Sequence, residues 1–319
     1  MGHLYKVMLE PFRNADQLEF KPKFIERYTA LTDWEEFKRY NLSFLRRSIR
    51  VNTLIADVKE TVESIKAKGW ELTPIPWSPL GFWIKHPDRN DVGNLSEHYF
   101  GKIYVQEAAS MIPPIILDPQ PGERVLDMCA APGSKTTQIA AMMENTGVLV
   151  ANDYRGMRAQ SLGINLQRCC VSNTTVTIAN GAAIKGEFDR VLCDVPCSGT
   201  GTIRKSVKTI RMWNPKTIPG IARQQLRLLS NGYKLLKRGG RVVYSTCSVE
   251  PEENEGVITK FLEKFPDAIL QPVELPGLKK SVVKEFKGVV YPEELTKCAR
   301  LWPQDNDTQG FFVACIEKP

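Results

Sequence analysis

Histidine is scarce in this chain of 319 residues, which contains three, and none of its eight cysteines forms a C-x2-C pair with another. Zinc sites and disulfide frameworks both depend on repeated Cys or Cys/His spacings. We therefore expect no bound metal. Most thiols should be free, as they are in a reducing compartment.

Long apolar runs are missing as well. No segment approaches the roughly 18 consecutive apolar residues that cross a bilayer. Residues 1–17 lack the apolar block and the small-residue cleavage site of a secretory signal. These absences predict a cytoplasmic protein without a membrane partner.

The composition is that of a folded protein, with 42% hydrophobic and 25% charged residues. At roughly 100–200 residues per domain, the length suggests two domains. The net charge of +7 weakly favours a polyanionic partner, because Lys and Arg can replace the counterions of a phosphate backbone.

The two parts of the chain differ in pattern. Over residues 1–112, helical spacing of apolar residues gives way to a strand, a helix and short strands, which predicts helices and a small α/β module. The proline-rich segment 113–123 predicts turns. Strands and helices then alternate, which predicts a doubly wound, mostly parallel sheet within 113–319. Ligands of such sheets bind beyond the carboxyl ends of the strands.

The first of these strand ends carries the motif DMCAAPGSKTT, which then opens a helix. Small residues such as Gly133 let a ligand approach the backbone closely. A P-loop is excluded because Ser134 stands where that motif needs the glycine before its lysine. The dinucleotide fingerprint G-x-G-x-x-G is also absent. The motif therefore predicts a different kind of cofactor turn.

Two polar residues end the next strands. Asp153 lies 20 residues after Gly133, where a carboxylate can bind both ribose hydroxyls of a nucleoside cofactor. The alternative role for Asp153 is a helix cap. Asn180 could contact adenine or, equally, serve the turn before Gly181.

Two cysteines follow later strands, Cys197 in LCDVPCSGTG and Cys247 in VVYSTCSVEPEENE. C5 of cytosine attacks a methyl donor only after a thiolate has added to C6, and a second group must then help to remove the C5 proton. A nearby cation lowers a thiol pKa, and Lys135 is a candidate for it. Asp194 could hydrogen-bond the amino and N3 side of the base, which must be flipped out or single-stranded.

The motifs DMCAAPGSKT, DVPCSGTG and YSTCS occur in this order and resemble those of the RNA 5-methylcytosine methyltransferase family called NOL1/NOP2/Sun. RVNTL and YVQEAASMIPP add to the resemblance, which covers residues 45–319. It implies a Rossmann-like S-adenosylmethionine-dependent methyltransferase domain with an RRM-like, RNA-binding α/β extension. It also implies that Cys247 is the nucleophile, that Cys197 assists product release, and that Lys135 and Asp194 lie in the active site.

The resemblance further implies a set of cofactor-binding residues around the first turn and the following strand ends. The cofactor would be S-adenosyl-L-methionine. The residues are Cys129, Ala130, Ala131, Pro132, Gly133, Ser134, Lys135, Asp153, Arg158, Asn180 and Asp194.

The chain departs from the family pattern at two positions. Asn180 stands where the family usually has Asp, and Gln304 replaces the usual His near the C-terminus. No PUA-type extension follows the catalytic region. Such a short form resembles archaeal tRNA methyltransferases, which makes tRNA the expected partner of a monomeric enzyme.

Several alternatives remain open from the sequence. The RNA could be ribosomal. A DNA cytosine-5 methyltransferase would use the Pro-Cys cysteine as nucleophile, an amino-group methyltransferase would need no thiol, and a non-catalytic RNA-binding protein could keep the same scaffold. The basic stretch 44–50, with Arg204, Lys205 and Lys208, could follow a phosphate backbone or form an ordinary solvated face.

Overall fold

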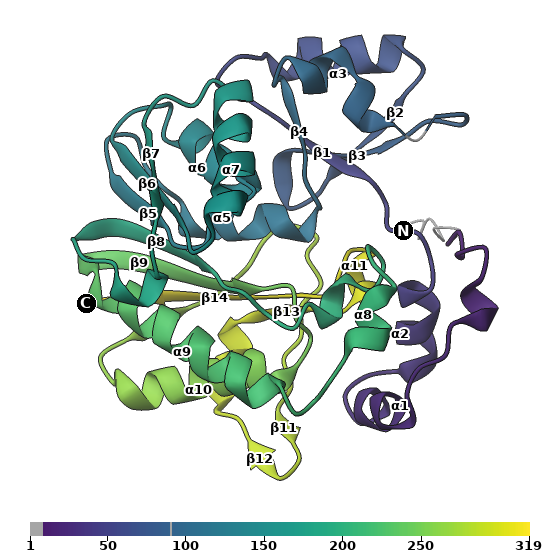
Figure 1. The fold of residues 1–319 in the computed structure, drawn as a ribbon, viewed down its shortest axis with the longest axis vertical. Helices are drawn as coiled ribbons and strands as arrows, with labels where there is room; N and C mark the ends of the chain where they lie inside the picture. The colour runs from purple at the N-terminus through teal and green to yellow at the C-terminus, as the bar shows by residue number, and fades with distance from the viewer. Residues whose placement is uncertain (1–8, 90) are drawn as a thin grey trace.

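The computed structural model describes residues 9–89 and 91–319. Residues 1–8, on which part of the secretory-signal prediction rests, lie outside the described residues. Two sheets dominate the fold, one of eight strands and one of four (Figure 1). Within the described ranges no helix combines the length and the apolarity needed to cross a membrane.

The eight-stranded sheet has the order β10-β14-β9-β8-β5-β6-β7, with β13 paired to β14. The neighbours from β9 to β7 are parallel, whereas β14 is antiparallel to β9 and β10 to β14. The sheet is therefore mostly parallel, as predicted. Its strands are β5 (Arg124–Asp127), β6 (Val148–Asp153), β7 (Thr174–Ile178), β8 (Phe188–Asp194), β9 (Leu236–Thr246), β10 (Ile269–Gln271), β13 (Ala299–Leu301) and β14 (Phe311–Glu317).

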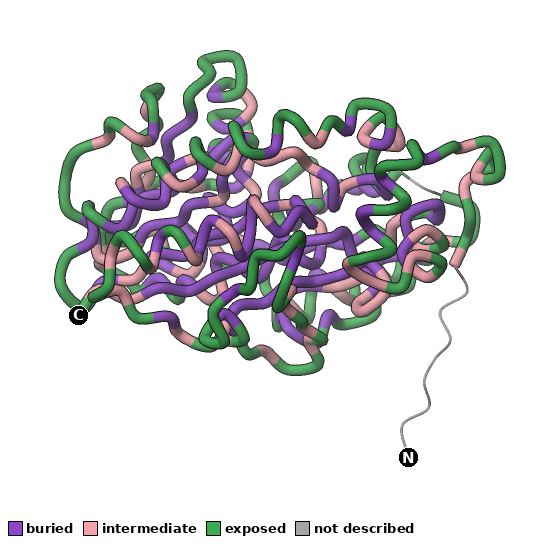
Figure 2. Tube along the Cα trace, turned by 90° about the horizontal axis from the view of Figure 1, so that it is seen from below, coloured by how far each residue is buried: buried purple, intermediate pink, exposed green. Residues whose placement is uncertain are grey.

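Helices cover both faces of this sheet (Figures 1 and 2). Successive side chains of a strand point to opposite faces. Leu126 accordingly packs with α9 and α10, whereas Val125 packs with α5 and α6. The helices of this region are α5 (Ile112–Leu117), α6 (Ser134–Met142), α7 (Gly156–Arg168), α8 (Lys208–Met212), α9 (Ile218–Lys234), α10 (Glu255–Lys264) and α11 (Pro303–Asn306).

Helix α5 corrects one prediction. The segment 113–123 was expected to form turns because of its prolines, yet its first residues belong to α5, which packs against β8, β9 and β14. The first N–H groups of a helix have no intrahelical partner, so Pro113 and Pro114 at its start sacrifice no hydrogen bond. The predicted domain boundary at 112/113 lies inside this helix.

The smaller sheet has the order β2-β3-β1-β4, with every neighbour antiparallel. Its elements run strand, helix, strand, strand, helix, strand, which is the connectivity of the predicted RRM-like extension. They are β1 (Ser48–Val51), α3 (Val58–Ala67), β2 (Glu71–Ile75), β3 (Ser78–Lys85), α4 (Ser96–Tyr99) and β4 (Ile103–Val105).

The first two helices, α1 (Pro22–Thr29) and α2 (Trp34–Asn41), do not join this extension. Their aromatic side chains pack with Trp213, Val249 and Trp302 near the ends of the large sheet. A short hairpin, β11 (Glu285–Phe286) and β12 (Val289–Val290), lies close to α1, because the guanidinium of Arg27 stacks 4.7 Å from the Phe286 ring centroid.

A glycine and an asparagine join the extension to the large sheet's helices. Asn52 Nδ2 donates to the carbonyls of Gly101 and Cys169, at 3.0 Å each. Gly101 has φ +71°, and a Cβ there would lie 1.8 Å from the carbonyl oxygen of Arg168. Only glycine fits where the two backbones approach so closely.

We therefore expect Gly101→Ala to lower the free energy of unfolding by more than about 2 kcal/mol, because backbone strain adds to a backbone clash. Gly122→Ala is the matched control, since Gly122 has φ +85° and a Cβ added there would meet no atom within 4 Å. Its cost should be only about 1–2 kcal/mol of backbone strain. Urea unfolding of both variants measures the difference, and equal losses would contradict the clash.

Candidate active site

The two predicted catalytic cysteines lie side by side at the carboxyl ends of neighbouring strands. Strands β8 and β9 are parallel, with Asp194 opposite Ser245 in the register. Cys247 follows β9 directly, and Cys197 lies three residues beyond β8. Their Sγ atoms are 3.0 Å apart, and both residues are half-buried.

The surroundings make the two thiols unequal. The Cys197 thiol hydrogen-bonds Cys247 and so lowers the Cys247 pKa, against the effect of burial; Lys135 also lowers it. The same hydrogen bond raises the Cys197 pKa well above the usual value, and burial and the charge of Glu253 raise it further. Of the two, Cys247 is therefore the thiol that ionises more readily, as expected of a nucleophile.

Lys135 and Asp194 form an ion pair beside the cysteines. Lys135 Nζ donates to Asp194 Oδ2 at 2.7 Å, and Ser245 Oγ donates to Asp194 Oδ1 at 2.7 Å. Burial lowers the Lys135 pKa, but Asp194 and its hydrogen bond outweigh this and raise it overall. The lysine is thus a permanent cation next to Cys247.

The cofactor turn joins β5 to α6. Gly133 has φ +107° and precedes α6, whose first turn has no side-chain cap. Its first-turn N–H groups can therefore serve an anionic ligand group. Ala131 N donates to Asp153 Oδ2 at 3.2 Å, and Arg158 donates to the Ala131 carbonyl at 2.6 Å. These contacts tie the turn to the end of β6.

The same end of the sheet fits a nucleoside cofactor. The Asp153 carboxylate is buried at the carboxyl end of β6, beside the turn. Tyr154, directly after β6, and Ile178, opposite Asp153 at the end of β7, expose large hydrophobic side chains. Helix α7 begins after Arg155, so Asp153 is not its N-cap. The Asp153 carboxylate suits the ribose hydroxyls of such a cofactor, the first-turn amides of α6 suit its carboxylate, and the exposed hydrophobic side chains suit its base.

Other predicted cofactor residues show local contacts. Asn180 Oδ1 accepts from Ala182 N at 3.0 Å, so this side chain serves the turn, and its contact with adenine stays a prediction. Burial raises the Cys129 pKa well above the usual value, which leaves it a neutral thiol. Ala130 N bonds the Asn152 carbonyl, and the Pro132 carbonyl accepts from Asn165.

The predicted residues thus form two neighbouring groups. Lys135 of α6 lies with Asp194 and the two cysteines at the ends of β8 and β9, whereas Asp153, Arg158 of α7 and Asn180 lie at the ends of β6 and β7. The turn after β5, from Cys129 to Ser134, lies between the two groups because β5 separates β8 from β6. Gln304 is elsewhere and donates to Thr32 Oγ1.

The predicted phosphate track is wrong for two of its arginines, which are buried. Arg50 donates to Gln106 and to Thr137 of α6, and Arg204 is paired with Asp307 at 2.7 Å. They join segments of the protein and are not available to a phosphate backbone. Lys205 and Lys208 are exposed.

Sequence reasoning missed the roles of Ser245 and Glu253. Ser245 fixes the Asp194 carboxylate, and Glu253 contacts the segments that follow both cysteines. Their only sequence signal was their place in the motif around Cys247.

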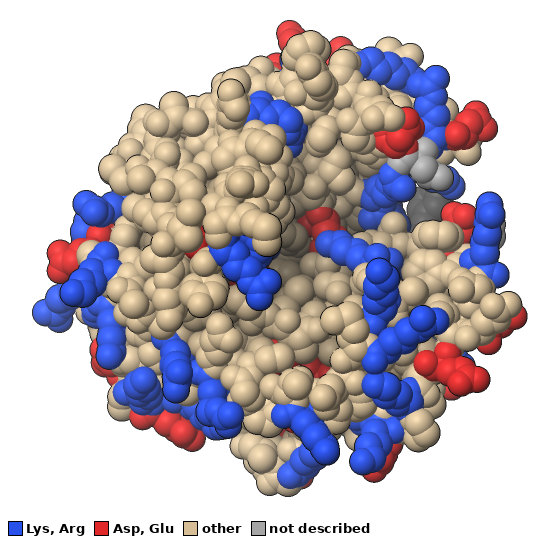
Figure 3. Space-filling model, in the orientation of Figure 1, with Lys and Arg blue, Asp and Glu red and all other residues tan. Residues whose placement is uncertain are grey.

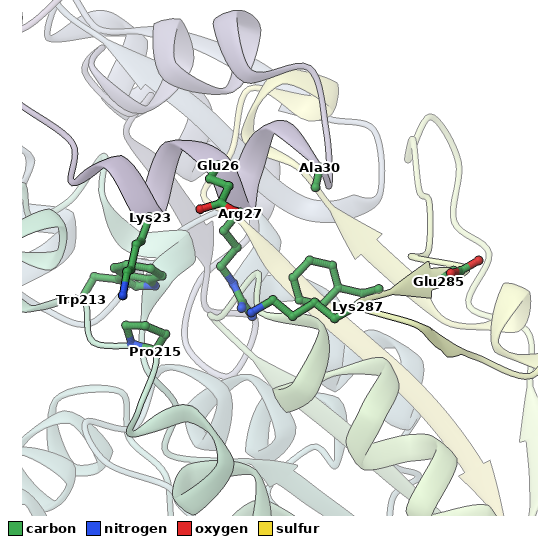
Figure 4. A pocket seen from close by; sticks show the side chains of 9 residues that line it. Lys23, Glu26, Arg27, Ala30, Trp213, Pro215, Glu285 and Lys287 are labelled. Carbon is green, nitrogen blue, oxygen red and sulfur yellow. The ribbon is translucent and has the colours of Figure 1, made fainter.

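The part of the chain that the structure describes has no candidate metal site, and the pocket that it contains near α1 lies away from the predicted site residues. No group of three or more His, Cys, Asp and Glu side chains there could hold a metal ion. A pocket of about 570 Å³ lies between α1, the segment after α8 and the β11–β12 hairpin (Figure 4), and none of the predicted site residues lines it.

Comparisons with known proteins show which family the chain belongs to. A family model described as 16S rRNA methyltransferase RsmB/F matches residues 114–317, and one described as the N-terminal domain of 16S rRNA methyltransferase RsmF matches residues 20–108. The chain belongs to the RsmB/F family. The predicted fold class, the resemblance to the Sun family and the enzyme class, an RNA cytosine-5 methyltransferase, are confirmed.

Individual members of the RsmB/F family are similar over most of the chain. A tRNA (cytosine(49)-C(5))-methyltransferase of Pyrococcus abyssi is 48% identical over 94% of this chain and 98% of its own length. The ribosomal RNA small subunit methyltransferase F of Erwinia tasmaniensis is 39% identical over 96% of this chain, but over 65% of its own length. The crystal structure of a methyltransferase homologue from Pyrococcus horikoshii matches with a TM-score of 0.86 at 36% identity, covering 96% of this chain and 98% of that one.

The cation beside Cys247 predicts a pH effect. Lys135→Met removes a charge that lowers the Cys247 pKa, so less thiolate forms at a given pH. The rise of the single-turnover rate with pH should move upward by about one pH unit. Lys234→Met is the control, because Lys234 is exposed at the end of α9, before β9 begins. An unshifted profile in Lys135→Met would contradict the role of this cation.

Proposed function

We propose that this protein transfers a methyl group from S-adenosyl-L-methionine to C5 of a cytosine in tRNA, with Cys247 as the nucleophile and Cys197 assisting release. The pair of unequal thiols, 3.0 Å apart beside a Lys–Asp ion pair, is the observation that carries this proposal. A thiol pair at neighbouring strand ends suits C6 addition followed by C5 deprotonation.

The choice of tRNA rests on identity, because the Pyrococcus abyssi relative, whose name specifies tRNA, is 48% identical. The chain spans 57–65% of the length of the bacterial relatives whose names specify ribosomal RNA. Ribosomal RNA remains the second candidate, because those relatives are still 39–42% identical.

The residues that would hold the cofactor are those around the turn after β5. Asp153 would bind the ribose hydroxyls, the first-turn amides of α6 the carboxylate, and Asn180 the adenine edge. Arg158 contacts both Asp153 and the Ala131 carbonyl, and so keeps this acid and the turn in place. When bound, the cofactor supplies an electrophilic methyl group at its sulfonium.

The first step joins the protein to the base. The Cys247 thiolate adds to C6 of cytosine, a sulfur–carbon bond forms, and the electron pair of the C5–C6 double bond makes C5 nucleophilic. Asp194 would accept a hydrogen bond from the amino group of the base. Lys135 and Ser245 hold the Asp194 carboxylate in one orientation. C5 is then able to take the methyl group.

The second step frees the product. A base accepts the proton of C5, the electron pair of the broken C5–H bond restores the C5–C6 double bond, and the C6–sulfur bond breaks so that Cys247 leaves as a thiolate. Cys197 is within reach of the same ring edge because its sulfur touches that of Cys247. We assign it to this elimination.

One face of the molecule suits a nucleic acid. Lys and Arg side chains gather on both sides of a central hollow in the face drawn in Figure 3, and acidic side chains are visible inside it. The net charge of +7 has the sign that a phosphate backbone requires. A target base must leave its stack to enter such a hollow.

The state of the thiols supports the proposed cytoplasmic location. All eight cysteines are free in the structure. A disulfide between Cys197 and Cys247 would remove the nucleophile, so the proposed reaction needs a reducing compartment. We also propose that the enzyme acts as a monomer, because one chain supplies every residue assigned here.

The two cysteine roles give opposite mutant phenotypes. Cys197→Ala should accumulate a covalent RNA adduct that survives denaturing electrophoresis, because addition proceeds while elimination is slowed by roughly 10²-fold or more. Cys247→Ala should form no adduct. The reverse pattern would assign the Pro-Cys cysteine as nucleophile, as in DNA cytosine-5 methyltransferases.

The substrate is tested by transfer to defined RNA. With cofactor that carries tritium in its methyl group, bulk tRNA should be labelled, and bisulfite sequencing should then locate protected cytosines in it. Label in ribosomal RNA alone would favour the second candidate. No label in either pool would favour a protein that only binds RNA.

A further inference from the structure

Glu253 lies behind the cysteine pair and contacts the residue that follows each cysteine. Its Oε2 accepts from the backbone N of Ser198 at 3.0 Å, and its Oε1 accepts from Ser248 Oγ at 2.9 Å. Gln225 Nε2 of α9 also donates to Oε2, at 2.8 Å. The Glu253 side chain is fully buried.

Hydroxyl groups complete this connection. Ser248 Oγ is 3.1 Å from Ser198 Oγ and 3.2 Å from Thr200 Oγ1. Thr200 Oγ1 accepts from Val249 N at 3.0 Å. Beyond the ladder, which ends at Asp194 and Ser245, these side chains join the segment after β8 to the segment after β9. They add to two backbone hydrogen bonds, from Val195 N to the Ser245 carbonyl and from Gly201 N to the Cys247 carbonyl.

A buried carboxylate is costly unless its oxygens are hydrogen-bonded, and each Glu253 oxygen has such a partner. The Glu253 carboxylate links the segment after Cys197 to the segment after Cys247, so it constrains the spacing of these two segments. A misplacement of about 1 Å can slow a reaction by roughly 10²-fold. The two thiols act on the same ring, so their spacing matters for both steps.

We propose that Glu253 is a positioning residue for the two-cysteine reaction: its carboxylate fixes the Cys197 segment against the Cys247 segment through Ser198 and Ser248. This inference rests on the proposed function only for its effect on catalysis. The positioning itself can be measured without RNA.

Glu250 offers a matched control on the same loop. It is also a fully buried carboxylate with three donors, here the side chains of Arg27, Tyr28 and Trp213. It ties the loop to α1 and to the segment after α8, and among the hydrogen bonds of the described residues its carboxylate has none with Ser198 or Ser248. Both substitutions to Gln remove one buried charge of the same size.

The first measurement uses the protein alone. Glu253→Gln and Glu250→Gln are equilibrated with mixtures of reduced and oxidised glutathione, and the Cys197–Cys247 disulfide is quantified by thiol alkylation and mass spectrometry. Forming it oxidises two thiols and reduces one oxidised glutathione to two reduced molecules. The equilibrium constant should fall at least tenfold in Glu253→Gln and stay within threefold of wild type in Glu250→Gln.

The second measurement uses tRNA and the methyl donor. In Glu253→Gln, kcat should fall by roughly 10–100-fold with the KM for tRNA within threefold, and the steady-state fraction of covalent adduct should rise. In Glu250→Gln the adduct fraction should match wild type even where the melting temperature falls. Ser248→Ala removes one of the two links and should change the adduct fraction in the same direction as Glu253→Gln. If Glu253→Gln does not fold, the result for Ser248→Ala tests the proposal instead.

Wild-type disulfide equilibria and adduct fractions in both Glu253→Gln and Ser248→Ala would overturn the proposal, as would equal effects in Glu250→Gln. Cys197→Ala serves as the reference for the reaction itself. If it traps no RNA while the disulfide equilibrium of Glu253→Gln still falls, the proposed function fails and the positioning role stands.

Discussion

The parallel pairing of β8 with β9 is the constraint on which the site depends. It puts Asp194 opposite Ser245, so the chain leaves both strands at the same edge and within one residue of the same level. Val195 N still donates to the Ser245 carbonyl, and Gly201 N donates to the Cys247 carbonyl, so the two segments stay paired after the strands end. A one-residue slip would turn Asp194 to the other face and separate it from Ser245.

Close packing behind this edge explains why small residues surround the thiols. Gly201 N bonds the Cys247 carbonyl, and a Cβ on Gly201 would lie 2.2 Å from the Gly310 carbonyl oxygen. A Cβ on Gly310 would in turn lie 2.4 Å from Val249 Cγ1. The segments around both cysteines and the start of β14 are therefore packed closely against each other. Rigid support of this kind is what preorganised catalysis requires.

The sequence was sufficient for the large sheet because its central strands are largely buried and most of them are separated by helices. It was also sufficient to bring the cysteines to one edge, since parallel strands end together. It was misleading where a local rule has an exception. Prolines at 113 and 114 occupy the first turn of a helix, and Arg50 and Arg204 are basic residues used as internal connectors.

Glu253 and Ser245 show why the supporting residues were harder to predict. An acid after a strand end is ordinarily solvated, and nothing in the letters PEENE distinguishes a residue facing α1 from one facing Ser198. That distinction arises because residues 251–253 form a 3-10 turn, which points Glu250 and Glu253 to different neighbours. A buried carboxylate needs hydrogen-bond donors. The donors of Glu253 come from α9 and from the segments after β8 and β9, so Glu253 supports the site directly. The donors of Glu250 come from α1 and from the segment after α8, so Glu250 supports the surrounding fold.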